Sequence, residues 1–73
     1  MKNRYKFINF DAVGEMNTCP LYACRNNKSG DAIGYVEWYP AWRQWVFNPE
    51  GTNIILSVSC MADIADFIGQ LKP

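Results

Sequence analysis

The segment Ala32–Asn48, with the sequence AIGYVEWYPAWRQWVFN, decides the fold. It contains all three tryptophans of the chain, and Pro40 lies at its centre between two runs rich in aromatic and β-branched residues. Such runs favour β-strands, and a proline between them favours a turn. We therefore expect two antiparallel strands over about residues 32–39 and 42–48, joined by a hairpin turn.

Pairing about this turn assigns each side chain of the hairpin to a face. A tight turn at Pro40 and Ala41 places Tyr39 opposite Trp42. Because strand side chains alternate between faces, the hairpin has one apolar face and one mixed face. With Arg43 at its edge, the apolar face is expected to comprise Gly34, Val36, Trp38, Trp45 and Phe47. The mixed face is expected to comprise Tyr35, Glu37, Tyr39, Trp42, Gln44 and Val46.

Three further strands are expected outside the hairpin. Residues 2–10 alternate in polarity and predict a first strand, and residues 21–25 predict a short second one. Between them, Asp11–Pro20 is expected to be a loop, because it contains glycine, asparagine and proline. Residues 53–58 predict a last strand that pairs with the end of the hairpin and extends its apolar face.

Residues 59–71 are expected to form the single helix. Ser59 is the expected N-cap, and Asp63 and Asp66 are expected on the solvated side. The apolar stripe must be buried against the apolar face of the hairpin, so residues 1–73 form one α+β domain. We expect a meander-like antiparallel sheet of four to five strands with the C-terminal helix packed on one face. The expected stripe is Met61, Ile64, Ala65, Phe67, Ile68 and Leu71.

Composition narrows the function classes. Seven basic and seven acidic residues give a formal net charge of zero, whereas domains that bind nucleic-acid phosphates are usually basic.

The N-terminal residues show no apolar run typical of a signal peptide, and no segment approaches the about 20 apolar residues of a membrane span. Three cysteines, an odd number, fit reduced thiols better than a disulfide framework. We therefore expect a cytoplasmic protein without a membrane segment.

The residues that carry chemistry predict no active site. The chain has no histidine, so the usual general base at neutral pH is missing. A structural zinc ion usually takes four Cys or His ligands, and the three cysteines are loosely spaced. Cys24 and Cys60 are expected to be small buried residues and Cys19 to lie in a loop. We expect no catalytic residue, no metal and no cofactor.

Residues 34–49 and 60–71 resemble a pattern found in small, mostly uncharacterised phage and bacterial proteins. That pattern has a glycine, a Trp-Tyr pair, a following Trp-Arg pair, an aromatic–x–Phe–x–Pro exit and a terminal helix that begins with cysteine. It is matched here by Gly34, Trp38-Tyr39, Trp42-Arg43, Trp45-x-Phe47-x-Pro49 and Cys60. The resemblance covers about the last forty residues. It implies a phage or mobile-element setting and supplies no catalytic residues.

The aromatic residues of the mixed face are the candidate binding site. Tyrosine, tryptophan and arginine dominate the energetics of protein interfaces. An alternative is that a second layer, from the Lys2–Phe10 strand or the Asp11–Pro20 loop, covers these rings. The candidate site comprises Tyr35, Glu37, Tyr39, Trp42, Arg43 and Gln44.

These observations favour a non-enzymatic module that binds a protein partner or forms a homodimer. With the phage resemblance, the expected role is an accessory protein that binds or inhibits a host or defence protein. The second reading is a nucleic-acid-binding sheet, and the third is a structural or assembly component. In the second reading, the phosphate contacts would come from Arg4, Lys6, Arg25, Lys28 and Arg43.

Overall fold

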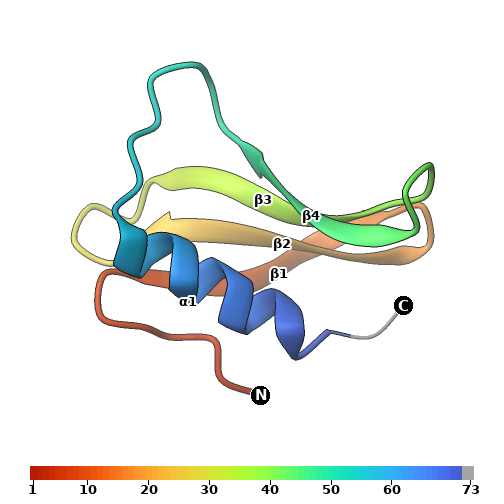
Figure 1. Cartoon of the computed structure of the whole chain (residues 1–73), viewed down its shortest axis with the longest axis horizontal. Coiled ribbons are helices and arrows are strands. Elements are labelled where there is room, and N and C mark those ends of the chain that lie inside the picture. The colour runs from red at the N-terminus through yellow and green to blue at the C-terminus, as the bar shows by residue number, and fades with distance from the viewer. Residues whose placement is uncertain (72–73) are drawn as a thin grey trace.

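The computed structural model describes residues 1–71 as one four-stranded antiparallel sheet with a single C-terminal helix (Figure 1). Each strand pairs with the next one along the chain, which gives the sheet order β1-β2-β3-β4. This arrangement confirms the expected α+β class with a meander. The elements are β1 (Ile8–Met16), β2 (Cys19–Asn26), β3 (Ala32–Tyr39), β4 (Gln44–Pro49) and α1 (Val58–Gly69).

The central hairpin forms, but its register differs from the expected one. Tyr39 pairs with Gln44 rather than with Trp42, which shifts the whole β3–β4 pairing by two residues. The turn therefore spans Pro40 to Arg43, and within it the N–H of Trp42 donates to Tyr39 O at 3.2 Å. A shift by two residues keeps every side chain on its face, because strand side chains repeat every two residues. The division into faces made from the sequence is thus retained.

The first hairpin corrects the prediction for the N-terminal third. The expected strand over 2–10 and loop over Asp11–Pro20 are wrong, because β1 runs through residues 8–16 and pairs with β2. The turn between β1 and β2 consists of Asn17 and Thr18, with φ of 55° and 64°. Asparagine tolerates this left-handed conformation, so two residues reverse the chain here.

Residues before β1 form a separate turn against the sheet. The N–H of Tyr5 donates to Ile8 O at 2.8 Å, which folds the chain sharply before β1. Asn27 holds this turn, because its Nδ2 donates to Tyr5 O at 2.8 Å and its N–H donates to Phe7 O at 2.9 Å. The sharp turn explains why the regular alternation expected for residues 2–10 fails and both Tyr5 and Ile8 are buried.

The segment between β4 and α1 is not the expected strand over 53–58. Its side chains still alternate: Ile54 and Leu56 are half-buried, whereas Ile55 is 95% exposed. Among residues 1–71 this segment takes part in no strand ladder. Ser57, not Ser59, is the N-cap of α1, and its Oγ accepts from the N–H of Cys60 at 3.1 Å.

The helix packs on the face of the sheet that carries Phe10 and Val36. Phe67 stacks on Phe10 with 4.1 Å between ring centroids and 2° between planes. Met61, expected in the buried stripe, is half exposed, and Ala65 is exposed too. The stripe is therefore narrower than expected. The buried core comprises Tyr5, Ile8, Phe10, Cys24, Val36, Ile64 and Phe67.

The N-terminal segment is tied to the far end of the helix. The hydroxyl of Tyr5 donates to Asp66 Oδ2 at 2.7 Å, and Gln70 bonds to both the N–H and the C=O of Lys2. Burial of the ring, and then the hydrogen bond to Asp66, raise the pKa of Tyr5 to about 12. Asp66 is exposed, as the sequence predicted, and through this hydrogen bond it also helps to close the fold.

Candidate protein-binding site

β4 is an edge strand, and among residues 1–71 no other strand pairs with the backbone groups on its outer side. The N–H of Glu50 donates to Ile33 O at 2.9 Å, which fixes the phase of the β3–β4 ladder. Hydrogen-bonded and non-bonded pairs alternate in an antiparallel ladder, so the N–H and C=O of Phe47 point away from β3. Pro49, which has no N–H, occupies an equivalent outward position, as edge-strand prolines do.

The opposite edge of the sheet, formed by β1, is partly covered. The N–H of Phe10 donates to Asn3 O at 2.8 Å, and Arg4 forms an isolated bridge with Asn9. A register shift between Ala12 and Gly14 also distorts β1. Coverage and irregularity both hinder pairing with another strand. Of the two edges of the sheet in residues 1–71, β4 is therefore the one open to a partner.

The turn between β3 and β4 presents two exposed aromatic rings beside that edge. Tyr39 is 40% exposed and Trp42 is 66% exposed, and their rings meet edge-on with 4.8 Å between centroids. Arg43 has a φ of 54°, a left-handed conformation that is uncommon for residues with a Cβ. This conformation turns the chain into β4 directly after Trp42 and so places the indole next to the strand.

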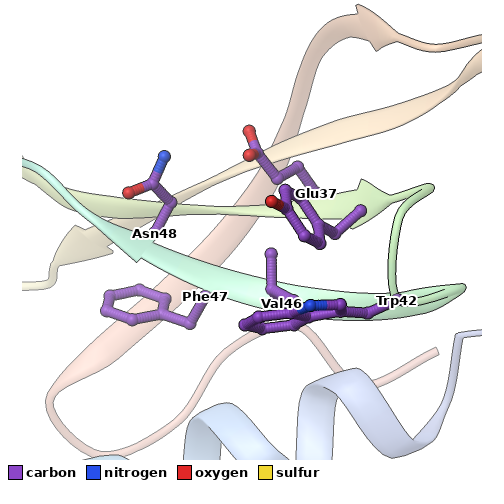
Figure 2. A pocket seen from close by; sticks show the side chains of 6 residues that line it. Glu37, Trp42, Val46, Phe47 and Asn48 are labelled. Carbon is purple, nitrogen blue, oxygen red and sulfur yellow. The ribbon is translucent and has the colours of Figure 1, made fainter.

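A shallow pocket of about 230 Å³ lies between these rings and β4 (Figure 2). Figure 2 shows the indole of Trp42 alongside β4, near Val46, and the side chains of Phe47 and Asn48 leaving β4 on opposite sides. The pocket thus wraps around the edge strand instead of lying on one face. Its lining comprises Glu37, Tyr39, Trp42, Val46, Phe47 and Asn48.

The structure brings together half of the residues predicted for the site. Glu37, Tyr39 and Trp42 line the pocket. Tyr35 is half-buried and pairs with Ala23 and Asn48, so it lies on the same face but outside the pocket lining. The exposed side chains of Arg43 and Gln44 also fall outside the lining.

Sequence reasoning missed Val46, Phe47 and Asn48 as lining residues. Val46 and Asn48 follow Gln44 on the same face by simple alternation, so the period of the strand could have found them. Phe47 belongs to the apolar face, and its ring packs against Gly34. It reaches the pocket only because β4 is an edge, and the sequence signal for an edge is Pro49, which has no N–H to donate.

The alternative in which a second layer covers the rings is not what the structure shows. Residues 2–7 contact the end of α1 through Tyr5 and Gln70, and residues 11–16 belong to β1 at the other edge of the sheet. Tyr39 and Trp42 accordingly remain exposed. The rings are available to another molecule.

The pocket lining presents a mixture of polar and apolar groups. The lining offers one carboxylate, one amide, one phenol and apolar surface. Cys24 lies in the core, where burial, and then the nearby Cys60, raise the pKa of its thiol to about 12. It is therefore protonated at neutral pH and is a packing residue, as expected. Within residues 1–71, no three His, Cys, Asp or Glu side chains are grouped to hold a metal ion.

Comparison with known proteins assigns this chain to no family. No protein-family model, curated protein or solved structure matches it. Residues 1–71 contain no helix that is long and apolar enough to cross a membrane. The class defined here is a small α+β domain, with an antiparallel meander, one helix on one face, and an open edge strand next to exposed aromatic rings.

Proposed function

We propose that this protein is a non-enzymatic interaction module that binds a protein partner at the β4 edge. The observation that carries the proposal is the exposed Trp42 at a pocket beside the open strand. Exposure of a large apolar ring to water is unfavourable, and its burial under a partner is favourable. Tryptophan and tyrosine are also the residues that contribute most to interface hot spots.

The proposed setting is that of a phage or mobile-element accessory protein that acts on a host or defence protein. Support comes from the resemblance of residues 34–49 and 60–71 to small phage and bacterial proteins. The same segments supply the hairpin that carries the pocket and most of the helix. The resemblance concerns the biological setting and not the mode of binding.

A nucleic-acid-binding role receives less support from the geometry. Arg25, one of the expected phosphate contacts, pairs with Asp11 at 3.0 Å. Arg4 and Lys6 lie before β1, whereas Arg43 lies in the turn before β4, at the opposite edge of the sheet. A strip of basic residues that follows one strand or one face would be needed to track a phosphate backbone.

The test is site-specific photo-crosslinking in cells. A photoreactive phenylalanine analogue replaces Tyr39 in one variant and Thr52, in the exposed loop after β4, in a matched control. We expect a discrete adduct from position 39 only, removed by protease and resistant to nuclease. Adducts removed by nuclease would replace the proposal by the nucleic-acid reading. Equal labelling at both positions would show that the pocket has no specific partner.

A further inference from the structure

We infer that the β4 edge binds an extended peptide segment and that the pocket receives an Arg or Lys side chain of that segment. The inference rests on the proposed function and names the chemistry of the partner. Its basis is a juxtaposition: an open backbone edge at Phe47, two aromatic rings, and a carboxylate at Glu37.

The pocket has the charge and the surfaces that a cationic side chain requires. Glu37 is the only charged residue in the lining, and among residues 1–71 it takes part in no ion pair. The faces of aromatic rings attract cations, tryptophan most strongly, and a carboxylate nearby adds to the attraction. Glu37 and Trp42 thus favour the same ligand charge, and both disfavour an acidic side chain.

The open backbone sets where such a side chain enters. An antiparallel segment that pairs with Phe47 satisfies the outward N–H and C=O of that residue. The neighbouring guest residue then lies opposite Val46 and on the same face as Val46 and Glu37. A long aliphatic stem can cross Val46 while its charged end stays near Glu37, as lysine and arginine stems do on apolar surfaces. A short side chain at this position would not reach Glu37.

The experiment uses the peptide acetyl-Thr-Val-Arg-Val-Thr-amide and its citrulline analogue, which has nearly the same shape without the charge. Binding to the full-length protein is followed by two-dimensional NMR. We expect shifts at the indole N–H of Trp42 and the backbone amide of Phe47. The citrulline peptide should bind about tenfold more weakly, which is about 1.4 kcal/mol. Both peptides are also titrated into Glu37→Gln, which should weaken binding of the arginine peptide alone.

Two variants control the titration. Trp42→Ala should reduce binding of the arginine peptide at least as strongly as Glu37→Gln does, because it removes the ring and the pocket wall. Ile55→Ala removes an apolar side chain that is even more exposed, on the loop before α1, and should leave binding unchanged. Circular dichroism of each variant verifies that a loss of binding reflects the pocket and not unfolding.

Four outcomes would overturn the inference. The first two are no binding up to about 10 mM peptide and equal affinities for the arginine and citrulline peptides. The third is a chemical-shift change at Trp42 without one at Phe47. The fourth is protection of the Phe47 amide that increases with protein concentration in the absence of peptide. The last would identify a second copy of the chain as the occupant. If the crosslink from position 39 still yields a discrete protein adduct, the inference fails while the proposed function stands. If both experiments fail, the inference and the proposed function are both rejected.

Discussion

The ring of Phe47 on β4 packs directly over the backbone of Gly34 on β3, in the space that a Cβ at position 34 would occupy. Asn48 O is also close, 2.8 Å from the site of that Cβ. Gly34 and Phe47 are diagonal neighbours in the β3–β4 ladder, since Phe47 pairs with Val36. Gly34 therefore permits the close approach of the edge strand on which the candidate site is built.

Gly34→Ala is expected to lower the free energy of unfolding by about 1–3 kcal/mol, because the added methyl group must displace a ring and meet a backbone oxygen. Gly14→Ala is the matched control, since nothing lies within 4 Å of a Cβ there. Urea denaturation of both variants provides the measurement. Equal effects of the two substitutions would contradict the close packing of Phe47 on Gly34.

Trp42 and Trp45 should respond oppositely to truncation. Trp45 is half-buried, contacting Trp38 at 5.7 Å and Tyr22 at 6.3 Å between ring centroids. Trp45→Ala should therefore cost about 3 kcal/mol, near the lower end of the usual range for a buried aromatic ring. Trp42→Ala should change stability by less than about 0.5 kcal/mol, because the ring is exposed. Thermal unfolding separates the two; a larger loss for Trp42→Ala would contradict the assignment of faces.

Trp45→Phe tests a finer feature of the same ring. The indole Nε1 of Trp45 is buried and donates to no acceptor among residues 1–71. A buried donor without a partner is destabilising, so removing it offsets part of the lost contact area. We expect Trp45→Phe to cost less than about 1.5 kcal/mol in urea denaturation. A cost equal to that of Trp45→Ala would show that the indole makes a contact that phenylalanine cannot replace.

The helix register predicts a contrast between Phe67 and Met61. Phe67 is fully buried against Phe10, whereas Met61 is half exposed. Phe67→Ala should lower the free energy of unfolding by about 3–5 kcal/mol. Met61→Ala should cost less than about 1 kcal/mol, because about half of its side chain already contacts water. If Met61→Ala proved the more destabilising, the wider stripe expected from the sequence would be the correct one.

Stability should fall steeply at alkaline pH. The pKa of Tyr5 is raised from 10.0 to about 12, and that of Cys24 from 9.0 to about 12, so the folded state holds both protons more tightly than the unfolded state. Their contribution is complete below pH 9 and is lost as the pH rises toward 12. Tyr5→Phe should make the decline above pH 10 less steep. Urea denaturation between pH 8 and 11 is the measurement, and an unchanged slope would contradict a protonated, buried Tyr5.

The left-handed Arg43 provides a test that separates strain from binding. Arg43→Gly should stabilise the turn by up to about 1 kcal/mol, because glycine adopts a positive φ without steric cost. Arg43 lies outside the pocket lining, so peptide binding should be unchanged. Chemical denaturation and peptide titration of the same variant measure both quantities. Destabilisation by glycine would mean that the arginine side chain makes a contact worth more than the strain.

From the central hairpin to α1, alternation in the sequence determined which side chains point inward, because the strand period is a local property of the chain. That is why the two faces of the hairpin persist through a register shift of two residues, and why Ile54 and Leu56 are half-buried without a strand. Helical spacing likewise located α1 and its buried residues Ile64 and Phe67.

Outside the central hairpin, tertiary structure alone decided which strands pair, and it also decided which edge stays open. Pairing requires a second strand at the right distance, and the turn at Tyr5–Ile8 and the two-residue turn at Asn17 and Thr18 determine where β1 lies. The first of these turns depends on contacts far apart in sequence, such as that of Asn27 with Tyr5. The pocket at β4 follows from the same cause: local period marks its side chains, but only the completed sheet leaves Phe47 at an edge beside Trp42.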